Sequence, residues 1–181
     1  MANPLAGYGV SDRDYATVIG TMMGEAANEG VKGMAAVADV IANRHASTDS
    51  YGIPTDSSLA GQALASRPSG RGKEFDAWNS SVAPKAYATA VQASRAALDP
   101  AYYASLPDAT KTKLDQAFQA AHGVLGTGTL RGITQGATFY NNPAATSAKM
   151  NRAMDDSRPT GSMRIGGHVF GGPEFDPKGQ I

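Results

Sequence analysis

The sequence predicts an α+β domain in which helices dominate, and three observations lead to this prediction. Apolar residues recur at helical spacing in several segments before residue 126. After residue 126, short apolar and aromatic runs alternate with glycine- and proline-containing stretches, as strands and turns do. The chain has 181 residues, which suits one domain with a substantial core. A run of helices followed by a small late β-element is typical of an α+β fold.

The first two predicted helices carry clear start and stop signals. Ser11, with Asp14 three residues later, has the form of a capping box. Asn28 and Gly30 favour a helix end, so we expect the first helix to finish near 26 or 27. A second helix should run from Val31 to about 44–45, where cations suit the helix dipole. The apolar positions that support these helices are Tyr15, Val18, Ile19, Met22, Val31, Met34, Val37, Ala38 and Ile41.

The middle of the chain predicts one short helix over 59–66, an irregular stretch over 67–81, and two longer helices. Pro84 suits the first position of the next helix, which should end at Asp99 and Pro100. Asp108 is expected to cap the helix after that. The apolar faces of these two helices are predicted to contain Tyr87, Ala90, Val91 and Ala97, and then Leu114, Ala117, Phe118, Ala121 and Val124 or Leu125.

The late β-element is expected at 138–140 and 163–170, with a polar loop between them. Residues 1–181 should form a single domain, with 1–10 as an extended lead-in and 171–181 as an extended tail. We find no internal repeat and no low-complexity block.

Composition excludes several function classes. The formal net charge is zero and no basic block occurs, so we expect no nucleic-acid partner. There is no cysteine for a disulfide or a thiolate. No apolar run is long enough to span a bilayer, so stable membrane insertion is not expected. Residues 1–10 lack the pattern of a signal peptide, so we expect synthesis in the cytoplasm.

The residues best suited to chemistry are Glu25 and Glu29, four positions apart where the first helix ends. A carboxyl at a helix C-terminus, near another acid and among apolar neighbours such as Met22 and Met23, has its pKa pushed upward. A raised pKa is what a general acid requires near neutral pH. The alternative interpretation is that both glutamates are solvated surface residues, because two acids at this spacing are common on helices.

Four segments of the chain resemble those of the SleB/CwlJ-type cell wall hydrolases. Gly24-Glu25-Ala26, followed by Glu29-Gly30 and a run to Asn43-Arg44, resembles the family's opening motif. Residues 73–79, with Phe75 and Trp78-Asn79, resemble its Phe-Ser-x-Trp segment. Residues 137–141 resemble its Ala-Thr-His-Tyr segment, and 165–170 its closing Gly-x-His-x-Phe segment. The chain departs from the family in having Phe139 directly after Thr138, without the usual histidine, and in a longer, more helical stretch between 78 and 136.

This resemblance implies a lysozyme-like, SleB-type catalytic domain that cleaves peptidoglycan glycan strands, most simply as a lytic transglycosylase. The family's catalytic glutamate corresponds to Glu25, and Glu29 and Arg44 would support it, with Arg44 paired to an acid such as Glu29. One acid/base group is enough for a transglycosylase, because the muramic acid's own C6 hydroxyl closes onto C1. A muramidase would need a second carboxylate, for which Asp76, Asp155 and Asp156 are candidates.

The predicted substrate-binding residues are Trp78, Tyr140, Asn141 and His168. Aromatic rings stack on sugar faces, and amides bind hydroxyl and acetamido groups. Core packing is the alternative for each ring, and we favour it for Phe75 and Phe170. His45 and His122 are interpreted as structural or surface residues, and His168 as a residue of the cleft or of the core. No HExxH or similar spacing is present, so we predict no metal and no cofactor.

Two other functions stay open at this point. One is a peptidoglycan amidase. The other is a non-catalytic domain that binds cell walls or builds a virion, which the missing histidine of the third segment keeps open. An enzyme made without a signal peptide would reach the wall as a phage-type lysin, either released through a holin or carried in a virion.

Overall fold

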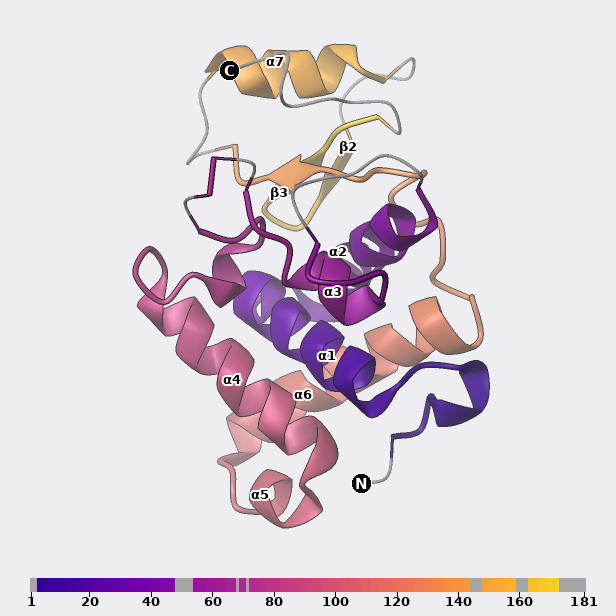
Figure 1. Ribbon diagram of the computed structural model, residues 1–181, viewed down its shortest axis with the longest axis vertical. Coiled ribbons are helices and arrows are strands. Elements are labelled where there is room, and N and C mark those ends of the chain that lie inside the picture. Colours follow the sequence, from indigo (N-terminus) through magenta and orange to yellow (C-terminus); the bar gives the residue numbers. More distant parts are fainter. Residues whose placement is uncertain are drawn as a thin grey trace.

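The computed structural model describes residues 3–47, 54–67, 69–70, 72–143, 148–158 and 163–172. Helices form most of this part of the chain, and a three-stranded sheet lies at one end, between α7 and the helical body (Figure 1). The predicted helix-dominated α+β class is therefore confirmed. No helix of the described residues is long and apolar enough to cross a membrane.

Helices α1 (Asp12–Ala26) and α2 (Gly30–Ala46) form the centre of the molecule and follow the predicted boundaries. The Ser11 hydroxyl accepts a hydrogen bond from the Asp14 backbone N–H at 3.1 Å, which is the predicted cap. The two helices are separated by a short break, and Gly30 has φ +65°, a left-handed conformation that suits glycine. The break turns the chain so that α2 packs against α1.

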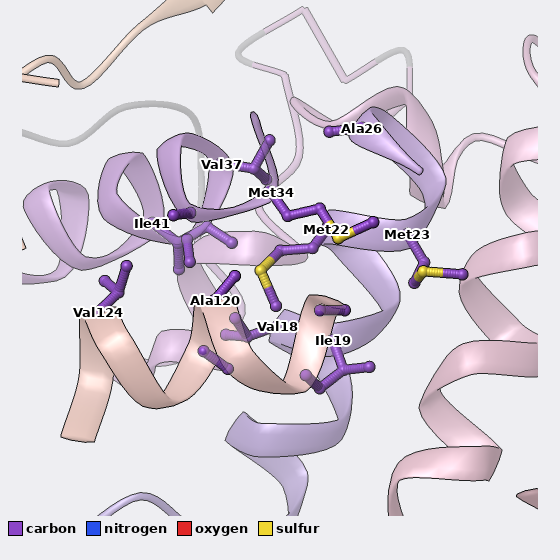
Figure 2. Packing of buried hydrophobic residues seen from close by; sticks show 14 of the residues in the cluster. Val18, Ile19, Met22, Met23, Ala26, Met34, Val37, Ile41, Ala120 and Val124 are labelled. Carbon is purple, nitrogen blue, oxygen red and sulfur yellow. The ribbon is translucent and has the colours of Figure 1, made fainter. Parts of the chain in front are cut away.

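The apolar core lies mainly between α1, α2 and α6 (Asp108–Ala121). Figure 2 shows Val18 and Met22 of α1 close to Met34 of α2, with Ala120 of α6 nearby. The side chains of Val18, Met22, Met34 and Ile41 have no exposed surface. Burial of each such side chain contributes about 1.5–3 kcal/mol to stability, so this contact fixes the central helix pair on which the rest of the fold is assembled.

Helix α4 (Pro84–Leu98) approaches α1 closely because both present small residues. The Ser94 hydroxyl donates to the Ala16 carbonyl at 2.9 Å, and a Cβ at Gly20 would lie 2.8 Å from the Ala90 carbonyl oxygen. The predicted face of α4 was partly wrong for this reason. Tyr87 and Val91 are exposed, and the buried residues are Ala90, Ala93, Ala96 and Ala97.

Three other predictions in the helical part need correction. Helix α3 spans only Leu59–Ala63. A short helix α5 (Pro100–Ala104) follows directly where only a stop was expected, since the Asp99 side chain accepts from the Tyr102 N–H and caps a new turn. Asp108 does not cap α6; it lies in the first turn and forms an ion pair with Lys111 at 2.7 Å. Helix α6 continues into a π-helical turn, η3 (His122–Gly126).

The amino-terminal segment is not an extended lead-in. Residues Ala6–Tyr8 form a 3-10 turn, η1, and the Leu5 side chain is fully buried in the core. The Asn3 side chain donates to the Val10 carbonyl at 2.8 Å and closes the turn. Of the predicted carboxyl-terminal tail, 173–181 lie outside the described residues.

The sheet is built from β1 (Tyr140–Asn141), β2 (Met163–Ile165) and β3 (His168–Phe170), in the order β1-β3-β2 with antiparallel pairs. The predicted late β-element is thus confirmed, although β1 covers Tyr140–Asn141 and not the predicted 138–140. Helix α7 (Ala148–Asp156), which packs on β3, was expected to be part of a polar loop. Most residues of α7 are polar, and its apolar residue Met154 packs against Val169 of β3.

Helix α2 holds this late segment through polar contacts. Asp39 is fully buried and accepts hydrogen bonds from the backbone N–H groups of Gly132 and Thr134 and from the Thr134 hydroxyl. It also pairs with Arg131. Burial raises the pKa of Asp39, but these hydrogen bonds outweigh burial and hold the pKa below its ordinary value. The Asn43 amide adds a bond to the Ala137 carbonyl at 2.7 Å.

We predict that Gly20→Ala destabilises the protein. The new methyl group would meet the backbone of α4, and overpacking of this kind costs about 1–3 kcal/mol, which exceeds the gain of up to about 1 kcal/mol in helix propensity. Thermal unfolding should show a midpoint lower by about 2–4 °C for each kcal/mol. Gly7→Ala is the control, since a Cβ there meets nothing within 4 Å. An equal or higher midpoint for Gly20→Ala would contradict the close approach of α1 and α4.

Candidate active site

Glu25 lies in the last turn of α1, and a backbone N–H of the segment before α4 holds its carboxylate. The Ala77 N–H donates to Oε1 of Glu25 at 2.7 Å, from the short helix η2 (Asp76–Trp78). Gly24 makes this contact possible, because a Cβ at Gly24 would lie 2.5 Å from the Ala77 Cβ. The sequence Gly24-Glu25 thus places a carboxyl where a backbone N–H can fix its orientation.

The pKa of Glu25 is raised above its ordinary value. Burial is the largest cause, and the negative charge of Asp76 raises the pKa further, while the Ala77 N–H and His168 act in the opposite direction. The upward direction is the one predicted from the sequence. The acidic neighbour among the main causes is Asp76, however, and not Glu29 as the spacing suggested.

Glu29 is the last residue of the break between α1 and α2, and it faces the sheet. Its carboxylate contacts Nδ1 of His168, on β3, at 3.1 Å. The hairpin turn leaves room for it, since a Cβ at Gly166 would lie 2.6 Å from Cδ of Glu29. The Glu29–His168 pair therefore joins the α1–α2 break to the β2–β3 hairpin.

Tyr140, on β1, completes the group around Glu25. Its ring packs edge-on against the His168 ring at 4.8 Å between centroids, and lies 5.5 Å from the Phe170 ring. Burial, and then the charge of Glu25, hold the pKa of the Tyr140 phenol well above its ordinary value. The hydroxyl has no partner at hydrogen-bonding geometry among the described residues, although it lies close enough to Glu25 to lower the pKa of that carboxyl. Tyr140 thus keeps its proton beside the glutamate.

The other predicted site residues face different parts of the structure. The Trp78 indole N–H donates to the Thr21 hydroxyl of α1 at 2.9 Å, and the ring lies over Gly20. This position anchors η2 on α1, and Trp78 is only partly buried. The Asn141 amide nitrogen is directed at the Met154 sulfur of α7, at 2.8 Å.

Arg44 and Glu29 do not form the predicted pair. Nε of Arg44 donates to the Thr138 carbonyl at 2.6 Å, and its guanidinium lies 4.8 Å from the centre of the Phe75 ring. Arg44 therefore fixes the strand that carries Tyr140, since Thr138 precedes it by two residues. This gives Arg44 a supporting position through the backbone of the segment that leads into β1.

Of the candidate second carboxylates, only Asp76 comes close to Glu25. Asp76 is half exposed and pairs with Arg67 at 3.0 Å. Asp155 and Asp156 lie on α7, on the far side of the sheet from α1 (Figure 1). Within the described residues, no cluster of three histidine or acidic side chains is arranged to hold a metal ion.

A groove of about 430 Å³ opens at the end of α1. One wall is formed by the end of α1 and the break that follows it, and the others by the amino-terminal parts of α4 and α6. Glu25 and Glu29 both line it. The lining residues are Met23, Gly24, Glu25, Ala26, Ala27, Asn28, Glu29, Lys85, Ala86, Thr89, Gln92, Thr110 and Lys113.

Sequence reasoning missed Ala77 and the groove residues of α4 and α6. Ala77 acts through its backbone N–H, which no residue type reveals. Lys85 and Lys113 belong to amphipathic helices, where lysine is ordinary, and only the packing of α4 and α6 against α1 brings them to the groove. Phe75 and Trp78 were the available signal that the loop before α4 is anchored near the site.

Comparison with known families agrees with the motifs in this arrangement. A family model described as Cell Wall Hydrolase matches residues 28–171. The chain belongs to the cell wall hydrolase family. This cell wall hydrolase is accordingly an enzyme that acts on peptidoglycan. The match includes Glu29, Tyr140 and His168 and begins three residues after Glu25. No curated protein and no solved structure matches the chain significantly.

We predict that Glu25→Gln stabilises the cell wall hydrolase, and more so at high pH. The folded-state pKa of Glu25 is raised above its ordinary value of 4.5, so burial of the charged form costs nothing below that value and its full amount above the raised pKa. Glutamine lacks this cost and can still accept from the Ala77 N–H. Thermal unfolding at about pH 4 and about pH 8, on either side of a raised carboxyl pKa, should show the larger gain at pH 8.

The matched control is Glu74→Gln, which changes the same group at a half-buried position outside the groove. A gain at Glu25 that is equal at both pH values, or no larger than that of the control, would contradict the raised pKa of the carboxyl.

Proposed function

We propose that this cell wall hydrolase is a lytic transglycosylase. It cleaves the β-1,4 bond between N-acetylmuramic acid and N-acetylglucosamine, with Glu25 as general acid and then general base. The observation that carries the proposal is the Glu25 carboxyl: it is buried, held by the Ala77 N–H and raised in pKa, and it belongs to a residue that lines a groove. The family motif around Gly24-Glu25-Ala26 supports the same residue.

The first step needs a proton on the glycosidic oxygen. Because the Ala77 N–H donates to Oε1, we assign the proton of the neutral carboxyl to Oε2, which would face the substrate in this mechanism. Burial and the charge of Asp76 keep a larger fraction of Glu25 protonated near neutral pH than an exposed glutamate would have. Glu25 then donates this proton to the leaving oxygen as the bond to C1 breaks.

The second step returns the proton. The C6 hydroxyl oxygen of the muramic acid attacks C1, and its proton passes to the Glu25 carboxylate. The products are a 1,6-anhydro sugar and a free 4-hydroxyl, no water is consumed, and Glu25 is again neutral. One carboxyl serves both steps, which fits a site in which Glu29 is already engaged by His168.

In this mechanism Tyr140, His168 and Glu29 form a support for the acid. The Tyr140 hydroxyl stays protonated and lies beside the Glu25 carboxylate that the first step creates. A donor in this position stabilises developing charge. The His168–Glu29 pair holds the ring of Tyr140 from the side.

A simple muramidase is the second candidate, and the position of Asp76 favours it. Asp76 is close enough to Glu25 to raise its pKa, so it is a possible second carboxylate for a hydrolytic mechanism. Its pairing with Arg67 and its exposure suit a surface ion pair equally well. Delivery through a holin or in a virion stays a prediction from the sequence.

We predict that Glu25→Gln abolishes wall lysis while the protein remains folded. General acid–base catalysis contributes about 10²–10⁴-fold, so the rate of turbidity loss of purified walls should fall by at least about 10²-fold. Asp76→Asn should keep most of the activity if the enzyme is a transglycosylase. Lysis by Glu25→Gln at the rate of the original protein would refute the assignment, and an equal loss in both variants would favour a muramidase.

Digestion of purified peptidoglycan should yield 1,6-anhydro-muropeptides. Because no water adds to the sugar, each new muramic acid end is lighter by one water than the reducing end that hydrolysis gives. Mass spectrometry of the soluble fragments measures this difference. Reducing ends would indicate the muramidase mechanism, and free stem peptides would indicate an amidase.

A further inference from the structure

The groove beside Glu25 carries two lysines that the catalytic mechanism does not use. Lys85 lies in the first turn of α4, and Lys113 lies in the second turn of α6. Both line the same groove as Glu25 although they are 28 residues apart in the sequence. They belong to the stretch between 78 and 136, which is longer and more helical than the family resemblance leads one to expect.

Within the part of the chain that the structure describes, neither lysine has an acidic partner. Among the residues that the structure describes, neither ammonium forms an ion pair, whereas Lys111, on the same helix as Lys113, pairs with Asp108. Lys113 donates to the side-chain oxygen of Asn28 at 2.7 Å, which holds its ammonium at the α1–α2 break. Lys85 is exposed. The groove that Glu25 lines therefore also carries two positive charges.

The rest of the groove wall is suited to a peptide. Thr89, Gln92 and Thr110 also line it, and their hydroxyl and amide groups can donate to and accept from a backbone. Within the described residues, neither acid of the groove lining is paired with these lysines: Glu29 contacts the His168 ring, and Glu25 is held by the Ala77 N–H. An anionic, amide-containing ligand fits this combination best.

We propose that Lys85 and Lys113 bind the carboxylates of the peptide stem that peptidoglycan carries on its muramic acid. This inference rests on the proposed function, because it places the sugar whose bond is cleaved at Glu25. The stem is attached to the same sugar whose bond is cleaved, so it lies close to the reacting bond. It can therefore enter the groove that Glu25 lines. The enzyme then selects peptide-bearing strands over bare glycan.

The test compares three substrates: peptidoglycan freed of other wall polymers, the same material with its stem carboxylates chemically amidated, and glycan strands from which an amidase has removed the stems. The measured quantity is the ratio of initial cleavage rates on peptide-bearing and bare strands. The original protein should favour native peptidoglycan over both other substrates, and added salt should reduce this preference because it screens exposed charges.

The double variant Lys85→Glu, Lys113→Glu should lower the ratio by roughly tenfold or more, since charge-assisted contacts are lost and repulsion replaces them. Lys85→Arg with Lys113→Arg should retain most of the preference. Lys149→Glu is the matched control, because Lys149 is an exposed lysine on α7, at the other end of the molecule (Figure 1), and should leave the ratio unchanged.

Two results would overturn the proposal: an unchanged ratio in the double glutamate variant, or an equal rate of the original protein on native and amidated peptidoglycan. These failures are distinct from failure of the proposed function. If Glu25→Gln is inactive and the ratio is insensitive to the lysines, the catalytic assignment stands and only the stem site is wrong.

Discussion

The hydrogen bond from the Ala77 N–H to Glu25 is the interaction on which the site depends, and it exists because α1 carries no side chain at Gly24. A methyl group at Gly24 would meet Ala77 and also the Ala86 carbonyl, 3.1 Å away. The same small-residue strategy continues along α1, where Gly20 admits Ser94 and the edge of Trp78. Close packing of α1 against η2 and α4 therefore buries the carboxyl, and burial is the largest cause of its raised pKa. Burial of the carboxyl lowers the free energy of unfolding, and the packing of the α1–α2 core offsets this loss.

The second constraint is the position of the sheet relative to α2, which must be fixed so that Tyr140 and His168 lie beside Glu25. Asp39, Asn43 and Arg44, all on α2, bind the backbone of 132–138 and so fix where the following strand begins. With Tyr140 opposite Phe170 in the β1–β3 pair, a shift by one residue would turn the Tyr140 ring to the other face of the sheet. The turn at Gly166 then allows Glu29 to reach His168. Tyr140 and His168 thus reach Glu25, more than a hundred positions away in the sequence, because side chains of α2 bind the backbone that leads into β1.

The sequence predicted the local parts of this structure well and the long-range parts unevenly. The ends of α1 and α2 follow from Ser11, Asn28 and Gly30, which act within a few residues. The prediction of the buried face of α4 was partly wrong. Hydrophobic periodicity favours the larger apolar residues, whereas the alanine face is the one that packs closely against the glycine-containing helix α1. Helix α7 was missed because few of its residues are apolar. Glu25 was found through its neighbours in sequence, but the acid that tunes it, Asp76, and the N–H that orients it become neighbours only in the folded chain.

The arrangement around Glu25 separates two tasks between two sides of the molecule. Tyr140, His168 and Glu29, on the sheet side, together with Ala77, determine how the carboxyl is held and how readily it gives up a proton. The groove on the helical side is lined by α4 and α6, and among the described residues their Lys85 and Lys113 form no hydrogen bond or ion pair with the groups that hold Glu25. Because Glu25 is oriented by a backbone N–H of η2, we expect substitutions at the groove lysines Lys85 and Lys113 to leave that bond in place. Substrate preference can therefore change through these helices while the chemistry at Glu25 stays the same, and a longer helical stretch between 78 and 136 is the natural place for such change.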